Sequence, residues 1–490
     1  MNKNTYKNFD ILIERHGSSY RARVLDSPSG QGATRIFQLP FTDEQLEILL
    51  LKIGRRRGMR GAPPSSNAAA IEFGGSLYSA VFQEQVQAHL LMSLQSTEEE
   101  QSGLRIRIRL SGCPELADLP WEYLYDPERR RFICLSTRTP MVRFLELPDP
   151  SRVLSVTGPL RMLVVISNPN EPDFDELDVE REWTNLEEAL SGVVESGYVE
   201  IDRLEPPTLS RLDAQLRHRD YHILHFIGHG RFSPQVGYGE LLFEDDNHRG
   251  LPVGAAQLAA LLHDHGSLRL AILNACEGAR TGHVDPLAGV AQTLVQQRIP
   301  AVVAMQFEIS DRAAIAFSKV FYEMLAVGDP IDTCIAHARR AIYAIPNPVE
   351  WATPVLYLRA ADGQVFDVSS TPTRIPDVPP RKAPSAESLW RATVSTEKRS
   401  SMVWATIINV ALTSESHIIV ARWGWSDSLE VDGRILKKSM NDLNGDHTFV
   451  LTDAGRRLAA ELTLTSKRMR YIVQSLVIDG QSLSWSDKEA

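Results

Sequence analysis

Between residues 151 and 365, short apolar runs alternate with stretches of helical periodicity, and this alternation limits the folds open to the chain. Strands that alternate with helices predict an α/β domain with a mainly parallel sheet and helices on both faces. The expected strands are RMLVVIS, VEIDRL, YHILHFI, LRLAILNA, AVVAMQF and TPVLYLR. The expected helices span residues 175–191, 207–219, 254–264, 285–298, 311–326 and 330–345. Because ligands of such sheets bind outside the carboxyl ends of the strands, catalytic residues are expected where these runs end.

The segments on either side of this core have different patterns. Residues 1–150 combine strand-like runs with helical patterns near 42–53 and 82–95, which predicts an α+β N-terminal region. Within it, LRIRIRLSG alternates apolar and basic residues and predicts a strand with one solvated face. Residues 366–400 are rich in proline, serine and charge and lack apolar periodicity, which is typical of a linker. Residues 401–490 contain short strand-like runs bounded by D-G and A-G turns, which predicts an all-β sandwich.

The composition excludes several classes of protein. The chain has 52 Lys plus Arg against 62 Asp plus Glu, a net charge of −10, which leaves no broad basic surface for nucleic acid or anionic lipid. No apolar stretch approaches the roughly 18 residues of a membrane-spanning helix, and the N-terminus lacks the apolar part of a signal peptide. The four cysteines include no C-x-x-C pair, so neither a disulfide scaffold nor a structural zinc site is predicted. We therefore expect a cytoplasmic protein that binds neither nucleic acid nor membranes.

Two strand ends carry residues suited to nucleophilic catalysis. YHILHFIGHGRF places His229 between Gly228 and Gly230, where both glycines allow tight backbone bends, and LRLAILNACEGAR places Cys276 at the end of the next long apolar run. Consecutive parallel strands bring both ends to one edge of the sheet, so the imidazole and the thiol are expected to lie within reach of each other. We predict that Cys276 is the nucleophile and that His229 is the general base and acid. The backbone N–H groups of Gly230 and Cys276 are the expected oxyanion donors.

Each of these residues has an ordinary structural explanation when it is taken alone. An unpaired cysteine at a strand end is commonly a small core residue, and a histidine there is commonly a hydrogen-bonded core residue, as we expect for His225. The combination favours catalysis, because both residues end apolar runs and both lie close to glycine. Their order and spacing match the caspase signature Q-A-C-[RQG]-G, which has its histidine about 50 residues upstream. The corresponding string here is Asn274-Ala275-Cys276-Glu277-Gly278.

Further motifs extend over nearly all of residues 100–360. They are LPWEYLYDP, HFIGHGRF, LLFEDD, LRLAILNACEGAR, the stretch from DPLAGV to FYEML, and ATPVLYL. Together they resemble the CHAT family of caspase-like cysteine peptidases. The resemblance implies a caspase-hemoglobinase fold, hydrolysis of peptide bonds through an acyl-enzyme, and the roles given above to Cys276 and His229. Because the sequence has no H-E-x-x-H motif, Gly-rich phosphate loop or carboxylate cluster, no metal or other cofactor is predicted.

The preferred cut site depends on the pocket for the side chain that precedes the scissile bond. The resemblance places Asn274 at the wall of this pocket, and a neutral asparagine selects no charge by itself. The acidic residues that are candidates for the same pocket are Asp246, Glu277, Glu308 and Asp311. A carboxylate there would pair with an arginine or lysine of the substrate. The alternative for each is a solvated loop charge or a helix cap, and Ser310-Asp311 has the pattern of a helix N-cap.

The C-terminal segment carries a second, looser resemblance. Its motifs are Val431-Asp432-Gly433 and Val477-Ile478-Asp479-Gly480, with His447-Thr448-Phe449 and Tyr471-Ile472-Val473 between them. They resemble the β-sandwich of the Fas apoptotic inhibitory molecule type, although each D-G pair also suits a simple hairpin turn. The resemblance supplies no catalytic group, and it implies binding of a protein partner, targeting or restraint of the peptidase.

Two functions of different classes agree with these observations. The main hypothesis is a bacterial, cytoplasmic CHAT-type cysteine endopeptidase that cleaves protein substrates and carries a C-terminal recognition or regulatory module. The alternative is a catalytically silent signalling scaffold that uses the caspase-like fold and the sandwich for protein binding. The proline-rich linker contains Arg374, Arg381 and Lys382, so an active peptidase with a basic cut site is expected to cleave it and release the sandwich.

Overall fold

The computed structural model describes the chain in segments that belong to two compact units, Met1–Ile375 and Pro376–Ala490. The described residues are 5–54, 67–172, 174, 176–233, 238–276, 286–345, 349–370, 391–400, 403–411, 416–423, 427–431, 434–439, 445–453, 456–467, 470–478, 481–482 and 485–487. The basic residues of the expected linker, Arg374, Arg381 and Lys382, lie outside these segments. None of the helices within them is long and apolar enough to cross a membrane.

One sheet organises the first unit. Its strands are β1 (Tyr6–His16), β2 (Ser19–Asp26), β3 (Thr34–Phe37), β4 (Gly103–Gly112), β7 (Met141–Phe144), β9 (Leu160–Ile166), β10 (Val199–Arg203), β11 (Ile223–Ser233), β12 (Tyr238–Glu244), β13 (Gly250–Gly254), β14 (Leu270–Cys276), β15 (Ala301–Met305) and β16 (Pro354–Leu358). The strand order is β10-β9-β11-β14-β15-β16-β7-β4-β1-β2-β3, and β12 and β13 extend the sheet from β11. Neighbouring strands from β10 to β15 and from β16 to β1 are parallel, which confirms the predicted mainly parallel sheet.

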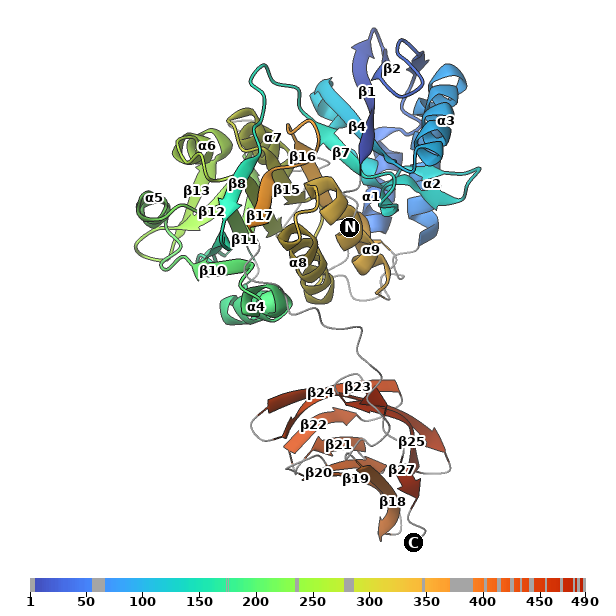
Figure 1. Cartoon of the computed structure of the whole chain (residues 1–490), viewed down its shortest axis with the longest axis vertical. Coiled ribbons are helices and arrows are strands. Elements are labelled where there is room, and N and C mark those ends of the chain that lie inside the picture. Colours follow the sequence, from blue (N-terminus) through green and yellow to red (C-terminus); the bar gives the residue numbers. More distant parts are fainter. Residues whose placement is uncertain are drawn as a thin grey trace. The chain divides into compact units, whose positions relative to one another are not determined.

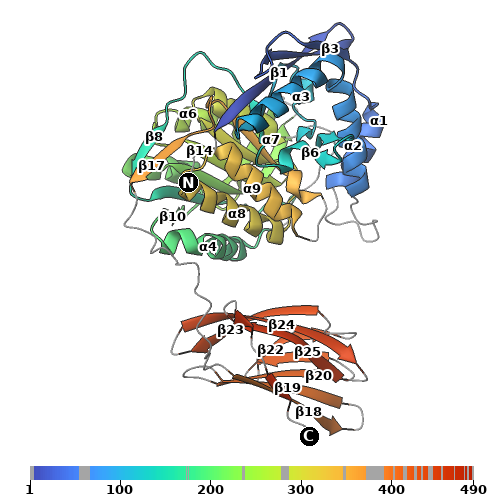
Figure 2. The same ribbon diagram turned by 45° about the vertical axis from the view of Figure 1, so that its right-hand side comes forward.

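Helices cover both faces of this sheet (Figures 1 and 2). They are α1 (Asp43–Gly54), α2 (Asn67–Val81), α3 (Glu84–Glu99), α4 (Val179–Glu195), α5 (Leu209–His218), α6 (Ala255–Leu262), α7 (Pro286–Gln296), α8 (Asp311–Ala326) and α9 (Ile331–Tyr343). The alternation along β14 explains the two layers, because successive side chains of a strand point to opposite faces. Leu270 and Ile272 pack in the core cluster shared with α4, α8 and α9, whereas Ala271 and Leu273 pack in the cluster shared with α5, α6 and α7.

Local capping sets where two of the predicted helices begin. Helix α8 has the predicted bounds, and its N-cap Ser310 accepts a hydrogen bond from the Ala313 N–H. Helix α4 begins at Val179, later than the apolar pattern indicated. The reason is that the Asp178 carboxylate accepts a hydrogen bond from the Arg181 N–H and caps the helix at that point.

Helix α2, which was not predicted from the sequence, contains the adjacent glycines Gly74 and Gly75. The glycine pair makes room for close packing, since a Cβ atom at Gly74 would lie only 1.7 Å from the carbonyl oxygen of Tyr123. Helix α2 therefore packs directly against the LPWEYLYDP segment, and glycine is required by this approach rather than by a turn. Such a requirement comes from a residue far away in the sequence and is invisible to local periodicity.

The basic residues of β4 are buried, which corrects the predicted solvated face. Arg105 Nε donates to the Asp332 carboxylate of α9 at 2.5 Å. Arg107 and Arg109 both pair with Asp10 of β1. A buried guanidinium needs such a partner, because an unpaired charge in the interior is strongly unfavourable. The predicted alternation of apolar and basic residues along β4 was correct. The arginines contact carboxylates of β1 and α9 where contact with water was expected.

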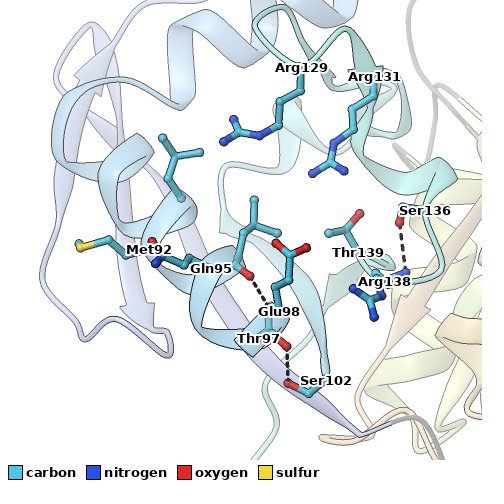
Figure 3. A pocket seen from close by; sticks show the side chains of 12 residues that line it. Met92, Gln95, Thr97, Glu98, Ser102, Arg129, Arg131, Ser136, Arg138 and Thr139 are labelled. Carbon is cyan, nitrogen blue, oxygen red and sulfur yellow. Dashed lines mark hydrogen bonds between the residues drawn. The ribbon is translucent and has the colours of Figure 1, made fainter. Parts of the chain in front are cut away.

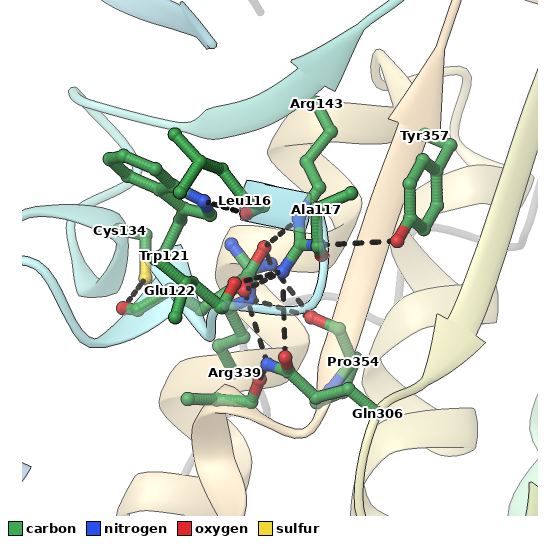
Figure 4. Close-up of polar contacts among 12 residues, drawn as sticks. Leu116, Ala117, Trp121, Glu122, Cys134, Arg143, Gln306, Arg339, Pro354 and Tyr357 are labelled. Carbon is green, nitrogen blue, oxygen red and sulfur yellow. Dashed lines mark hydrogen bonds and ion pairs between the residues drawn. The ribbon is translucent and has the colours of Figure 1, made fainter. Parts of the chain in front are cut away.

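A buried polar cluster joins the N-terminal segment to the sheet (Figure 4). Glu122, in the short helix η2 (Trp121–Tyr123), accepts from Arg143 Nη2 of β7 at 2.7 Å and from Gln306 Nε2 at 3.1 Å. Arg339 of α9 donates to the Pro354 carbonyl at 2.7 Å, and its Nη2 lies 3.9 Å from Glu122 Oε1. Since Gln306 directly follows β15, the cluster ties the N-terminal segment to the sheet edge at which β15 ends.

Strands from before and after residue 150 belong to the same sheet. The expected boundary between an N-terminal region and a peptidase domain at residue 150 therefore stays a prediction. Both ends of the expected linker are also strands. Strand β17 (Phe366–Ser370) pairs with β8 (Leu154–Thr157) in the first unit, and β18 (Arg391–Ser400) belongs to the second unit. Residues 371–390, between these strands, lie outside the described residues.

The described residues of the second unit form two sheets. They are β18, β19 (Val403–Ala411), β20 (Ser416–Trp423), β21 (Asp427–Val431), β22 (Arg434–Ser439) and β27 (Trp485–Asp487) in one sheet, and β23 (Gly445–Asp453), β24 (Arg456–Lys467), β25 (Arg470–Ile478) and β26 (Gln481–Ser482) in the other. One core cluster contains Ile408 and Ile419 from the first sheet and Leu462 and Leu476 from the second. The two D-G pairs of the proposed resemblance, at residues 432–433 and 479–480, lie outside the described residues.

Candidate active site

His229 and Cys276 are directly opposite each other in neighbouring parallel strands. The register of β11 and β14 runs without a shift from the pair Ile223–Leu270 to the pair His229–Cys276. Strand β14 ends at Cys276, whereas β11 continues to Ser233 and pairs there with β12. The structure thus brings the two positions to one edge of the sheet; the side chain of Cys276 is outside what it describes.

The two glycines beside His229 make room for neighbours and do not bend the strand, contrary to the tight bends expected from the sequence. Neither Gly228 nor Gly230 adopts a positive φ, and β11 runs through both. A Cβ atom at Gly228 would lie 2.8 Å from the carbonyl oxygen of Ser167, which follows β9. A Cβ atom at Gly230 would lie 3.3 Å from Leu287 Cδ2, so the first turn of α7 approaches the strand at this point.

Replacing Gly228 by alanine should destabilise the protein by about 1–3 kcal/mol, because the Ser167 carbonyl belongs to the backbone and has no flexible side chain to yield. The displaced strand carries His229, so any thiol-dependent activity should fall as well. Urea unfolding of the whole chain measures the first effect. Gly192→Ala in α4 is the matched control: its Cβ atom would meet nothing within 4 Å, and alanine should stabilise the helix by about 0.5–1 kcal/mol. Equal stability of the two variants would contradict the steric explanation.

An aromatic ring restricts the imidazole of His229. The His229 side chain is 7% exposed, and its ring centroid lies 5.0 Å from that of Phe174. Phe174 lies between β9 and α4. The contact limits the orientations of the ring and shields one side of it from solvent. Phe174 was not predicted from the sequence, because no periodic pattern marks that segment.

His225 lies on the same face of β11 as His229 and has a core environment, as the sequence analysis expected. A hydrogen bond of 2.9 Å joins the Tyr322 hydroxyl of α8 to His225 Nδ1. Burial lowers the pKa of His225 from 6.5 to about 4. The imidazole is therefore neutral at neutral pH.

The unfolding free energy should decrease as the pH falls from 6.5 to 4. Burial lowers the pKa of both His225 and His222 from 6.5 to about 4, with the Arg161 charge adding to the effect at His222. In this range the unfolded chain binds protons at the two imidazoles and the folded chain does not, so protonation favours unfolding. Urea unfolding across the range should show a weaker pH dependence for His225→Gln than for the wild type. The exposed His218→Gln is the control, and an equally strong pH dependence in all three proteins would refute the assignment.

A small cavity of about 20 Å³ lies beside these strand ends, between the sheet and helices α4 and α8. It brings together Asn274 of β14 and Asp311 of α8, two of the residues predicted to bind substrate. Glu182 and Asn185 of α4 also line it. These two residues were not predicted from the sequence, although their spacing of three places them on one helix face. The cavity has room for about one water molecule and not for a side chain.

The mouth of this cavity carries an ion pair between the two helices. Arg181 Nη2 of α4 lies 2.5 Å from the Asp311 carboxylate of α8. The Arg181 side chain is 63% exposed and that of Asp311 is 28% exposed. The candidate acid for a basic substrate is thus already paired with an arginine of the chain itself.

Two other candidates for substrate binding, Asp246 and Glu308, do not line this cavity. Asp246 is exposed in the turn between β12 and β13. Glu308 is half-buried in the segment between β15 and α8. Glu277 lies outside the described residues. Among the residues that the structure describes, no group of three His, Cys, Asp or Glu side chains is arranged to hold a metal ion.

The other three thiols of the chain are poor nucleophiles. Cys113, Cys134 and Cys334 are all buried and unpaired by disulfides. Burial raises the pKa of each, that of Cys134 to about 12. Cys134 Sγ also donates to the Glu122 carbonyl at 2.9 Å. These thiols stay protonated at neutral pH, whereas nucleophilic attack requires a thiolate.

The family model of the CHAT domain matches residues 72–410, which is more than half of the chain. The chain belongs to the CHAT domain family. The CHAT match begins in α2, includes both His229 and Cys276, and ends in β19 of the second unit. No curated protein matches the chain.

Two crystal structures of the Saccharomyces cerevisiae separase–securin complex are similar to this CHAT protein. The TM-scores are 0.30 and 0.31, with 14% and 13% sequence identity. The similarity covers 65% and 64% of the CHAT protein and, in both cases, 22% of the matched chain. The CHAT protein therefore spans less than a quarter of the length of the chain it matches.

Proposed function

We propose that this CHAT protein is a caspase-like cysteine endopeptidase that cleaves protein substrates with Cys276 and His229. The observation that carries the proposal is the register of β11 and β14, in which these two residues are partners. Partners on neighbouring strands share a face of the pleated sheet, and the strands lie about 4.8 Å apart. At that spacing an imidazole and a thiol come within reach of proton transfer.

The proposed reaction proceeds through an acyl-enzyme. His229 takes the proton of the Cys276 thiol, and the sulfur attacks the scissile carbonyl carbon to form a C–S bond. The resulting oxyanion accepts hydrogen bonds from the N–H groups of Gly230 and Cys276. The C–N bond then breaks, and the leaving amine receives the proton from His229. A water molecule that His229 deprotonates attacks the thioester, the C–S bond breaks, and the departing sulfur regains the proton.

We propose that the enzyme cleaves after a basic residue. The support is the cavity beside the strand ends, where Asp311 and Glu182 provide carboxylates and Asn274 a neutral wall. The cavity is too small for a substrate side chain, so the first turns of α4 and α8 must separate before substrate binds. The exposed Arg181–Asp311 ion pair is weak enough for a substrate guanidinium to displace. In this proposal Arg181 occupies the place of the substrate side chain in the resting enzyme.

We assign a recognition or regulatory role to the second unit, as a β-sandwich of the Fas apoptotic inhibitory molecule type in a cytoplasmic, bacterial enzyme. The core cluster shared by its two sheets is consistent with a sandwich. A basic cut site also suits the linker residues Arg374, Arg381 and Lys382. Cleavage there would release the second unit, and intact-mass measurement after activation would detect the two products.

A covalent peptide probe tests this function. A peptidyl acyloxymethyl ketone with arginine next to the reactive group should label the full chain at Cys276, as located by peptide mass spectrometry. Labelling should be absent in Cys276→Ala and unchanged in the control Cys113→Ala. A matched probe with aspartate should label about 10-fold less, and Asp311→Asn should reduce this preference.

The possible outcomes separate the proposals from each other. Equal labelling by the arginine and aspartate probes would support the endopeptidase function and contradict the preference for a basic residue before the cut. A wild-type chain that stays unlabelled under every activating condition would refute the enzyme and favour the silent signalling scaffold.

A further inference from the structure

The N-terminal region contains a second cavity, which shares no residue with the candidate active site (Figure 3). It has a volume of about 420 Å³ and lies between α3 and the segment that includes β6 (Arg131–Phe132) and η3 (Ile133–Leu135). Cavities of this size are typical of small-molecule binding sites. The cavity beside Asn274, in contrast, has about 20 Å³.

One side of this cavity is cationic. Arg129 lies in the turn between β5 (Tyr125–Asp126) and β6, Arg131 is the first residue of β6, and Figure 3 shows both side chains extending toward α3. Arg138 lines the cavity from the segment that follows η3. Arg129 pairs with Asp126 at 3.1 Å. Within the described part of the chain, neither Arg131 nor Arg138 has an ion-pair partner.

The opposite side, formed by α3, combines three apolar side chains with the polar side chains of Gln95 and Thr97 and one carboxylate. Leu91, Met92 and Leu94 line this wall, and Met92 is 49% exposed. Glu98 extends from α3 into the same cavity toward the arginines (Figure 3). Thr139, which also lines it, is buried. The cavity thus combines three guanidinium groups, an apolar stretch of α3 and a single carboxylate, with amide and hydroxyl groups between them.

We propose that this cavity binds a phosphorylated small molecule of nucleotide size whose base carries an amino group. Arg131 and Arg138 bind the phosphates, because a guanidinium donates paired hydrogen bonds that fit phosphate oxygens. The apolar wall at Leu94 and Met92 contacts the base. Glu98 accepts a hydrogen bond from the amino group, which gives a role to the one carboxylate in a cationic cavity.

Contacts connect this cavity to the end of β15. Thr139 Oγ1 donates to the Ile133 carbonyl at 2.7 Å, and Cys134 donates to the Glu122 carbonyl. Glu122 in turn binds Gln306, which follows β15. A ligand that holds the segment from Arg131 to Thr139 should therefore raise the melting temperature of the first unit. This binding does not depend on the proposed peptidase function.

Calorimetric titration of the full chain with ATP tests the proposal. We expect one ATP per chain, with an affinity that decreases as salt is added. The double variant Arg131→Glu/Arg138→Glu should bind ATP at least about 10-fold more weakly. Arg152→Glu, at an exposed arginine outside the cavity, should bind as the wild type does. Circular dichroism checks that each variant is folded, and Arg131→Lys/Arg138→Lys, which keeps the charge, should retain part of the affinity.

Related ligands test the separate contacts. In ITP, a carbonyl replaces the amino group of adenine. The wild type should therefore bind ITP more weakly than ATP, whereas Glu98→Gln should bind the two nucleotides with equal affinity. Undetectable binding of ATP, or unchanged binding by Arg131→Glu/Arg138→Glu, would overturn the proposal. Pyrophosphate that binds as tightly as ATP would overturn the contact with the base. A hexaglutamate peptide that binds more tightly than ATP would overturn the small-molecule ligand in favour of an acidic peptide.

Discussion

Cys276→Ala should lower the rate of peptide hydrolysis by about 10⁴- to 10⁶-fold, because the chain then lacks the group that attacks the carbonyl carbon. His229→Ala should cause a loss of similar size, since the thiol would have no base to remove its proton. The measurement is hydrolysis of a fluorogenic peptide with a basic residue before the cut, by the full chain under conditions that activate the wild type.

The double variant distinguishes catalysis from general damage to the fold. Two residues that act as one unit have strongly non-additive effects, so Cys276→Ala/His229→Ala should be no slower than either single variant. His218→Gln is the control, because this exposed histidine of α5 does not line the candidate site and has no role in the proposed reaction. A His229→Ala enzyme that kept most of its activity would remove the histidine from the mechanism.

Glu122→Gln should lower the unfolding free energy by about 3–5 kcal/mol, which is the typical effect of breaking a buried ion pair. The Glu122 carboxylate is 2% exposed and sits between the buried guanidinium groups of Arg143 and Arg339. Glutamine keeps the shape but removes the charge, so both cations lose their counter-ion. Urea unfolding followed by tryptophan fluorescence measures the change, because Trp121 is buried in the cluster (Figure 4) and the buried Trp351 contacts Tyr123, the residue after Glu122.

An exposed ion pair provides the control for this experiment. Glu115 pairs with Arg15 at the surface, where solvent already screens both charges. Glu115→Gln should therefore leave the unfolding transition almost unchanged. If Glu122→Gln and Glu115→Gln destabilised the protein equally, burial of the Glu122 cluster would not be the source of the effect.

Much of the first unit was predictable, because local patterns decide its elements. The spacing of apolar residues gave the bounds of α8, and the alternation of strands and helices gave the mainly parallel sheet. The errors arose where a distant residue decides the local structure. Gly74 belongs to a helix because the Tyr123 carbonyl leaves no room for a side chain. The arginines of β4 are buried because Asp10 and Asp332 lie opposite them.

The same distinction applies to the candidate site. The order of the strands predicted that β11 and β14 would end at one edge of the sheet, and the register places His229 opposite Cys276 there. The residues that surround them come from other elements: Phe174 from the segment before α4, and Glu182 and Asn185 from α4 itself. Their positions depend on how helices pack over the sheet, which no local pattern specifies. The catalytic roles remain predictions.

The continuity of the sheet through β16 and β7 bears on any attempt to work with a shortened protein. A fragment trimmed to the residues after 150 would lack β7 and would leave open the edge of β16 at which Tyr357 and Leu358 pair with β7. Bare, apolar strand edges pair with other chains and promote aggregation. The strands before residue 150 thus complete the sheet beyond β16, and a fragment designed to stay in solution would have to include them.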